Sequence, residues 1–409
     1  MPAPPDLITY NPFFRLAELL KPLTVGRSPL PDGRPINLGI GDPRTEMPAF
    51  ALKAMADASA GWSRYAAARG HPDTLAAMVE WLERRFGLPK GLVDPVKNLV
   101  PVSGSREGLY FSTLAAVQAK RAALGGETPV VLLPDPGYHV YGGSARASGA
   151  ELHFVPVDAQ SGHLPRYASL PSDILARAAI AYLCSPANPQ GVIASPDVLH
   201  ETLAATRQHG CLLAVDECYS ELYTGTAPTG ALSIAAGTPE GLAGLVVFHS
   251  LSKRSGAPGL RLGFMAGDPL LMRQAEGHLR FGGAGFPSPV LAAGAALWRE
   301  ESHVEANRAY YNRNLALAER ILGPGFGWKQ PQGGFFGWVD ISAGKYRDGV
   351  SAVKALYQKA GITALPGSFL SLADRPEDQN PGHRYIRLSL AEPPEILGPA
   401  LTRLAESLL

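Results

Sequence analysis

Residues 245–254 read LVVFHSLSKR, an apolar run that ends in two serines, a lysine and an arginine. The run Leu245–Phe248 has the length and composition of a buried strand of a parallel sheet. Lys253 follows the end of that strand among hydroxyl groups, and Arg254 places a second cation beside it. A lysine in this setting can lose its proton and attack a carbonyl, as lysines that form Schiff bases do. A solvated Lys-Arg pair in a loop is the alternative from these residues alone.

Other short apolar runs are followed by polar loops in the same way, and helical patterns alternate with them. The clearest helical pattern spans 72–86, and an alanine-rich one spans 290–297. This alternation predicts an α/β fold with a mostly parallel sheet and a site at the carboxyl ends of the strands. Strands are expected at 130–133, 151–155, 179–183, 211–215, 245–249, 262–266, 335–339 and 385–390.

A candidate phosphate site lies at residues 102–110, which read VSGSREGLY. Here a short apolar stretch ends in small residues and a helix pattern follows. Free N–H groups and the dipole at a helix start attract a phosphate, and the serine hydroxyls add donors. A Ser-Gly-Ser helix cap that binds no ligand is the alternative.

Four further side chains could serve a cofactor such as pyridoxal phosphate. Asp216 ends the apolar run 211–215, where a carboxylate can keep a pyridine nitrogen protonated, and Tyr219 could donate to a ring oxygen. Asn188 and Tyr138 lie in loops rich in Pro and Gly after apolar strands, and they offer an amide and an aromatic face. Taken singly, Asp216 could equally be a helix cap, and the others ordinary turn or core residues.

Together these motifs resemble the fold-type I pyridoxal-phosphate enzymes, specifically the class I and II aminotransferases, from Asn37 to about Ala391. The matching elements are Tyr65 and Gly70, Gly104-Ser105-Arg106, Asn188-Pro189-x-Gly191, Asp216-x-x-Tyr219, Ser250-x-Ser252-Lys253, Arg261, the GGFF run at 333–336, and Arg387. The resemblance implies a large domain, in which helices enclose a mostly parallel seven-stranded sheet, and a smaller α/β domain from both termini. The implied division is an N-terminal arm and part of the small domain at 1–44, the large cofactor-binding domain at 45–294 and the C-terminal small domain at 295–409.

The resemblance also implies roles for individual residues. Lys253 would bind pyridoxal 5′-phosphate as a Schiff base and move a proton, with Asp216 and Tyr219 as further catalytic residues. Asp216 would pair with the ring nitrogen, Asn188 and Tyr219 would hold the ring hydroxyl, and Tyr138 would stack on the ring. The phosphate would be bound by Ser105, Arg106, Ser250, Ser252 and Arg261. Tyr65 would reach the phosphate of the neighbouring subunit, so the resemblance implies a homodimer with shared active sites.

Arg387 aligns with the family arginine that grips the substrate α-carboxylate. A planar guanidinium matches a carboxylate with two parallel hydrogen bonds, which a lysine cannot do. Gly41 offers close backbone approach to the same carboxylate, and Asn188 lies in the implied substrate site as well. Locally, Arg387 also fits an alternating strand with one outward cation.

Longer strings are similar to those of the N-succinyl-LL-diaminopimelate aminotransferases of lysine biosynthesis: 216–223 (DECYSELY), 250–261 and 365–370 (LPGSFL). This likeness implies amino transfer from N-succinyl-LL-diaminopimelate to a 2-oxo acid such as 2-oxoglutarate. Gly256-Ala257 and the glycine-rich segment 282–286 depart from that group, so aspartate, aromatic and other amino acids stay open as donors. A carbon–sulfur lyase on the same scaffold is the alternative of another class. The cations available for a second carboxylate, each expected on the solvated surface, are Arg44, Arg69, Arg254 and Arg280.

Composition supports a small-molecule enzyme. The 409 residues suffice for two domains, and 37 Lys and Arg against 36 Asp and Glu argue against a nucleic-acid or membrane-surface partner. Cys184, Cys211 and Cys218 lie in or beside apolar segments without zinc-site spacing, so we expect no metal and a reducing compartment, the cytoplasm. No uninterrupted apolar stretch approaches ~18 residues, so no membrane span is expected.

Overall fold

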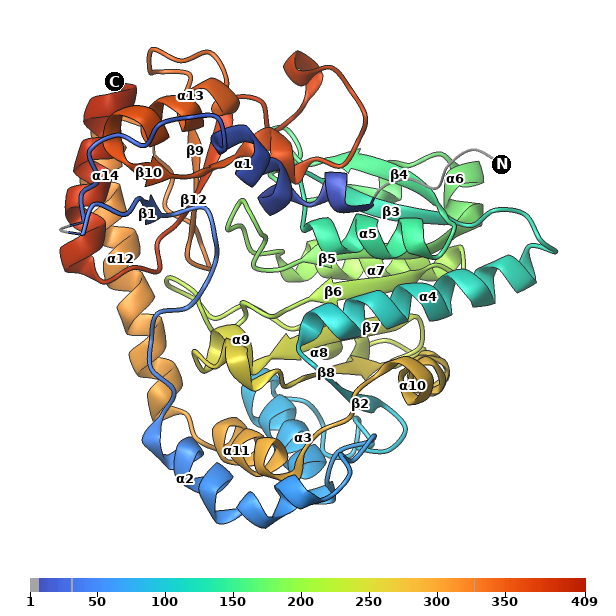
Figure 1. Cartoon of the computed structure of the whole chain (residues 1–409). Coiled ribbons are helices and arrows are strands. Elements are labelled where there is room, and N and C mark those ends of the chain that lie inside the picture. The colour runs from blue at the N-terminus through green and yellow to red at the C-terminus, as the bar shows by residue number, and fades with distance from the viewer. Residues whose placement is uncertain (1–6, 31, 327) are drawn as a thin grey trace.

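The protein is described by a computed structural model that covers residues 7–30, 32–326 and 328–409. Within these residues a seven-stranded sheet forms the centre, in the order β2-β8-β7-β6-β5-β3-β4 (Figure 1). Neighbouring strands are parallel except where β8 pairs with β2 and with β7. The strands are β2 (Leu99–Val102), β3 (Val130–Asp135), β4 (Glu151–Pro156), β5 (Ala178–Cys184), β6 (Leu212–Asp216), β7 (Leu245–Ser250) and β8 (Gly263–Gly267).

Helices cover both faces of this sheet, since the central strands β5, β6 and β7 are buried along their whole length. On one face pack α4 (Ser105–Ala123), α5 (His139–Ala147) and α10 (Pro269–Gly282). On the other pack α3 (Pro72–Phe86), α6 (Ser172–Arg177), α7 (Pro196–Gln208), α8 (Ala231–Ala236) and α11 (Ser288–Arg299), with α2 (Ala49–Asp57) against α11. The predicted fold class is confirmed.

A second core is built from both ends of the chain. Leu16 and Leu38 pack in one cluster with Leu388 and Leu404. Its strands are the parallel pair β1 (Ile36–Asn37) and β10 (Ile362–Thr363), and the antiparallel set β11 (Leu365–Pro366), β12 (Tyr385–Ser389) and β9 (Phe336–Asp340). Its helices are α1 (Pro12–Leu20), the C-terminal part of α12 (Ser302–Phe326), α13 (Gly349–Ala355) and α14 (Pro394–Leu408). The division at residues 44 and 294 stays a prediction. Helix α11, which contains residue 294, packs on α2 and α3.

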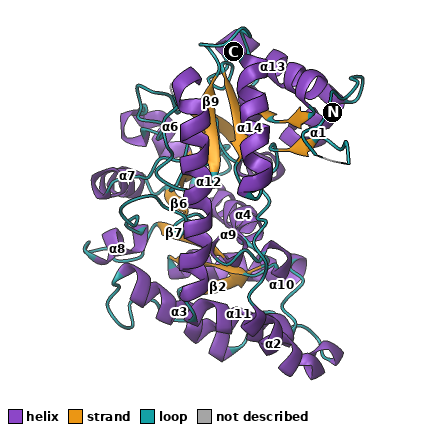
Figure 2. Ribbon diagram, turned by 90° about the vertical axis from the view of Figure 1, so that its left-hand side faces the viewer, coloured by secondary structure: helices purple, strands orange, loops and turns teal. Residues whose placement is uncertain are grey.

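Helix α12 links the two cores. Figure 2 shows it running from the end beside α11 to the end beside α14. Its last turns contribute Leu315, Leu322 and Phe326 to the second core, while its first turns lie beside the segment that carries Lys253. A single rigid element therefore contacts both the site and the smaller core.

The strands and helices predicted from the sequence are confirmed, most to within a residue or two. Strand β2 was not predicted, because Pro101 stands inside a run of only four residues, and proline is rare within sheets. No helix in the described part of the chain is long and apolar enough to cross a membrane.

Candidate active site

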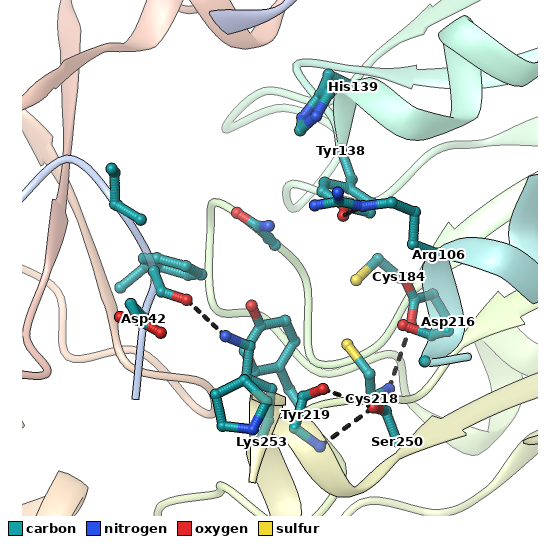
Figure 3. Close-up of a pocket in the computed structure, with 18 of the residues that line it drawn as sticks. Asp42, Arg106, Tyr138, His139, Cys184, Asp216, Cys218, Tyr219, Ser250 and Lys253 are labelled. Carbon is teal, nitrogen blue, oxygen red and sulfur yellow. Dashed lines mark hydrogen bonds between the residues drawn. The ribbon is translucent and has the colours of Figure 1, made fainter. Parts of the chain in front are cut away.

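A cavity of about 270 Å³ opens where the carboxyl ends of β5, β6 and β7 face the smaller core (Figure 3). Every residue predicted for the site lines this cavity except Tyr65. Parallel strands bring the residues that follow them to one edge of the sheet, which is why motifs far apart in the sequence meet here. The roles given to these residues stay predictions.

Lys253 projects into the cavity from a one-turn helix, α9 (Leu251–Arg254). Strand β7 ends at Ser250, whose Oγ accepts the N–H of Ser252 at 3.1 Å and caps this helix. The Lys253 Nζ donates to the carbonyl of Gly41 at 2.5 Å. Burial lowers the pKa of Lys253 to about 8. Part of the lysine population therefore carries a free amine near neutral pH.

Asp216 ends strand β6 and is 2% exposed. Its Oδ2 accepts a hydrogen bond from the Tyr141 hydroxyl at 2.9 Å, and its Oδ1 accepts the N–H of Cys218 at 3.3 Å. Burial raises the pKa of Asp216, and the bond from Tyr141 acts in the opposite direction. Sequence reasoning missed Tyr141, although it follows Tyr138 by three residues at a helix start, a spacing that places both on one face.

The start of α4 and the side chain of Arg261 line one side of the cavity with hydrogen-bond donors and positive charge. Gly104 has φ 78°, and a Cβ there would lie 2.5 Å from Nη2 of Arg261. A glycine is therefore required for that guanidinium to approach. Arg261 is held by the carbonyl of Ser103, to which its Nη2 donates at 2.6 Å. The serines that line the cavity with it are Ser105, Ser250 and Ser252.

Arg387 reaches the cavity from strand β12 and is 3% exposed. Its Nη1 donates to Oδ1 of Asn188 at 3.1 Å, its Nη2 donates to the carbonyl of Gly39 at 2.7 Å, and its Nε has no hydrogen-bond partner. Burial lowers its pKa to about 10, so the guanidinium stays charged at neutral pH. Gly41 lines the same wall, where a Cβ would collide with the ring of Phe336.

Aromatic rings complete the cavity. Tyr138 accepts a hydrogen bond from Nε of Arg106 at 3.3 Å, and the buried ring of Tyr219 lies edge-on to Phe336 with centroids 5.9 Å apart. His139, which sequence reasoning also missed, contacts the ring of Phe13 from helix α1. Burial lowers the pKa of His139 to about 4, so its imidazole is neutral.

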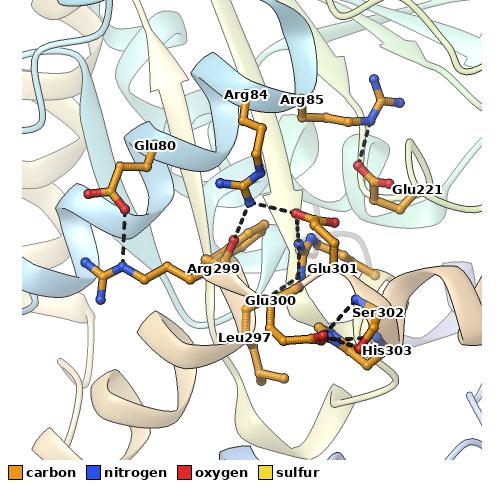
Figure 4. Close-up of polar contacts among 12 residues, drawn as sticks. Glu80, Arg84, Arg85, Glu221, Leu297, Arg299, Glu300, Glu301, Ser302 and His303 are labelled. Atoms are coloured by element: carbon orange, nitrogen blue, oxygen red, sulfur yellow. Dashed lines mark hydrogen bonds and ion pairs between the residues drawn. The ribbon is translucent and has the colours of Figure 1, made fainter.

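Two sequence predictions lie elsewhere. Tyr65 is fully exposed and does not line the cavity, so its contact with a neighbouring subunit stays a prediction. The expectation of a solvated surface for Arg254 is wrong, because this residue is 2% exposed and its guanidinium lies beside the rings of Trp81 and Trp298. Its charge is paired with Glu301, which also binds Arg84 (Figure 4).

These residues fit pyridoxal phosphate. Because Gly104 has no side chain, Arg261 and the start of α4 can both face a phosphate. The buried carboxylate of Asp216 suits a protonated ring nitrogen. The amine of Lys253 can react with an aldehyde, and the unpartnered Nε of Arg387 can still donate. Among the described residues, no group of three or more His, Cys, Asp or Glu side chains is placed to hold a metal ion.

Known proteins resemble this chain along almost its whole length. The sequence profile of the family described as "Aminotransferase class I and II" matches residues 34–404. An LL-diaminopimelate aminotransferase of Desulforudis audaxviator is 31% identical over 376 residues, 90% of this chain and 89% of that protein. The crystal structure of an aminotransferase from Neisseria meningitidis superposes with a TM-score of 0.88 at 31% identity, covering 98% and 99% of the two chains. A probable N-succinyldiaminopimelate aminotransferase from Thermus thermophilus shares the fold, with a TM-score of 0.82, 23% identity and coverage of 97% and 100%.

Proposed function

Because the chain belongs to the class I and II aminotransferases, enzymes that depend on pyridoxal 5′-phosphate, we propose that it transfers an amino group from N-succinyl-LL-diaminopimelate to 2-oxoglutarate in lysine biosynthesis. The observation that carries the assignment of the site is that the Lys253 amine, the buried Asp216 carboxylate and the Arg387 guanidinium meet in one cavity. The Desulforudis and Thermus proteins, both named as aminotransferases of diaminopimelate compounds, support a donor of the diaminopimelate class. Unmodified LL-diaminopimelate is the second candidate, because the more similar of these two relatives is named for it.

The protein residues have distinct tasks in this proposal. When bound, pyridoxal phosphate supplies a carbonyl that takes up the amino group and a ring that withdraws electrons from the reacting carbon. Lys253 would take a proton from Cα of the donor and deliver it to the carbon that was the carbonyl carbon of the cofactor, a task that its lowered pKa permits near neutral pH. Asp216 holds a proton on the ring nitrogen, since a buried carboxylate is stabilised by a cation. Asn188 and Tyr219 bind the ring oxygen, and Tyr138 stacks on the ring.

Separate sets of cavity residues bind the α-carboxylate of the donor and the phosphate of the cofactor. Arg387 binds the α-carboxylate of the donor, with Gly41 and Asn188 beside it. The bonds to Asn188 and the Gly39 carbonyl fix the plane of the guanidinium and leave Nε free to donate. The residues proposed to bind the phosphate are Ser105, Arg106, Ser250, Ser252 and Arg261.

The test is an absorbance scan of the purified holoenzyme before and after the addition of each diaminopimelate donor, without any oxo acid. We expect N-succinyl-LL-diaminopimelate to convert the visible band of the lysine-linked cofactor to the band of the amine form. Conversion by LL-diaminopimelate alone would support the second candidate. Conversion only by glutamate, aspartate or aromatic amino acids would refute both donors and keep the class. Release of ammonia without the amine form would favour a carbon–sulfur lyase.

The proposal includes a homodimer in which Tyr65 completes the partner's site. The complete exposure of Tyr65 and the nearly complete exposure of Phe281 support a covered face in the assembly. Mixing Tyr65→Ala and Lys253→Ala proteins would then restore one native site per mixed dimer and part of the activity. We place the enzyme in the cytoplasm, on the strength of its three free cysteines, and cell fractionation would test this.

A further inference from the structure

The helix that carries Lys253 is only one turn long. Helix α9 comprises Leu251–Arg254. A single turn has no cooperative stability of its own in water, and the carbonyls at its end need hydrogen-bond partners. The position of the Lys253 main chain must therefore come from contacts made by other elements.

Asn307 of α12 supplies such a contact. Its Nδ2 donates to the carbonyl of Lys253 at 2.9 Å and to the carbonyl of Arg254 at 3.1 Å. The side chain is 5% exposed, so little water competes for these bonds. At the other end of the helix the Ser250 hydroxyl caps the N–H of Ser252. The lysine turn is thus held by a side chain at each end.

The other face of the same amide binds the segment that the lysine touches. The Asn307 Oδ1 accepts a hydrogen bond from the Thr45 hydroxyl at 3.1 Å. Thr45 follows Gly41 by four residues, and the Gly41 carbonyl accepts the bond from the Lys253 Nζ. A Cβ on Gly256 would collide with Thr45, so the lysine turn and this segment are in close contact. Asn307 therefore links the main chain of Lys253 to the segment 41–45, whose Gly41 carbonyl accepts the hydrogen bond from the lysine amine.

Residues between Leu297 and His303, which Figure 4 labels, hold Arg254 and Ser255 at the end of the turn. Arg254 donates to the Leu297 carbonyl at 2.6 Å and to Glu301 at 2.8 Å. His303 contacts the Ser255 hydroxyl at 2.8 Å through Nε2. These contacts hold the turn against the end of α11 and the start of α12, whereas Asn307 reaches the main chain of Lys253 itself.

We propose that Asn307 is a positioning residue for Lys253: it links the lysine turn to the segment that carries Gly41 and Thr45, and so places the amine for proton transfer. The inference rests on the proposed function of Lys253 but adds a residue that does not line the cavity. Its loss moves the amine, while the two arginines proposed to bind the phosphate and the carboxylate, Arg261 and Arg387, keep their own hydrogen bonds, none of which involves Asn307. The chemical step is therefore affected more than substrate binding.

The test compares Asn307→Asp and Asn307→Ala with Asn312→Ala. Asn307→Asp keeps the shape but replaces both N–H donors with an oxygen that repels the two carbonyls. Asn312 is the matched control, since it also bonds one main-chain carbonyl, that of Tyr223, from the same helix. The readouts are kcat and KM, the cofactor retained after gel filtration, and the pH midpoint at which the visible band of the lysine-linked cofactor titrates.

We expect both Asn307 variants to lose about 30-fold in kcat with KM changed by less than about threefold, because a misplaced reacting group slows the chemical step. The titration midpoint of the band should move in both variants, and Asn312→Ala should match the native enzyme. Thr45→Val should move the midpoint in the same direction by a smaller amount, and it replaces Asn307→Ala if that protein does not fold.

An unchanged kcat and midpoint in the folded Asn307 variants would overturn the inference. A lower melting temperature and less retained cofactor with an unmoved midpoint would also overturn it, since that pattern indicates a structural role. If the native enzyme transfers no amino group from any donor, the proposed function fails separately, and the midpoint comparison still tests the placement of the lysine.

Discussion

Tyr141→Phe is expected to lower the rate of amino transfer, because it changes the pKa of Asp216. The change removes the hydroxyl that donates to Oδ2 at 2.9 Å and keeps the ring, which stacks on Tyr182 with centroids 4.3 Å apart. A hydrogen bond to a charged group contributes roughly 1.5–3 kcal/mol, which corresponds to about 1–2 units of pKa. Burial already raises the pKa of Asp216, and the Tyr141 bond favours the ionised form. Its loss therefore raises that pKa further, so the carboxylate takes up a proton at a higher pH.

The assay is the half-reaction with the amino donor, followed by absorbance from pH 5 to 9. We expect the acid limb of kcat/KM to move to higher pH by about one unit and the rate at pH 7 to fall about tenfold. Tyr167→Phe is the control, because it also removes a buried hydroxyl. That hydroxyl donates to the Tyr182 carbonyl over 2.5 Å, and Tyr167 does not line the cavity. An unchanged acid limb in Tyr141→Phe, with a folded protein and native cofactor content, would refute the reasoning.

Two further variants test other parts of the site, and a third tests a buried ion pair outside the cavity. Lys253→Ala should retain cofactor without a covalent link and lose about 10³-fold in transfer, as checked by borohydride trapping and single turnovers; native turnover would contradict its role. Gly104→Ala forces a Cβ against Arg261 at φ 78°, so cofactor affinity should fall by about tenfold or more in a fluorescence titration, with folding retained. Arg375→Ala leaves the buried carboxylate of Asp135 without its cation and should cost about 2 kcal/mol. Because burial already raises the pKa of Asp135 and removal of the cation raises it further, this loss should grow from pH 4 to pH 8 in thermal melts; equal losses would contradict it.

The ends of the parallel strands could be predicted from local sequence. The runs that end at Asp216 and Ser250 are short and wholly buried, and a polar residue directly after such a strand lies at the same sheet edge as its counterparts. Cavity residues such as Asp216 and Lys253 were therefore accessible to sequence reasoning.

Contacts between distant elements could not be predicted in the same way. The bond between Arg387 and Asn188 joins residues 199 positions apart, and that between Asn307 and Lys253 spans 54. Arg254 looked like a loop cation because Trp81, Trp298 and Glu301, which bury and neutralise it, are distant in the sequence, and the residues around Arg254 do not reveal that they pack there. Tyr65 is fully exposed in the single chain, so its contact with a neighbouring subunit stays a prediction.

The shared core of the two chain ends has a consequence for synthesis on the ribosome. Arg387 bonds the Gly39 carbonyl across 348 residues, and Leu16 and Leu38 pack with Leu388 and Leu404. At about 5–20 residues per second, the N-terminal segment emerges roughly 20–70 seconds before its partners. The central sheet can form during this interval, while the part of the cavity that contains Arg387 is assembled last. A nascent chain stalled before residue 380 should therefore present a folded sheet and an N-terminal segment open to protease.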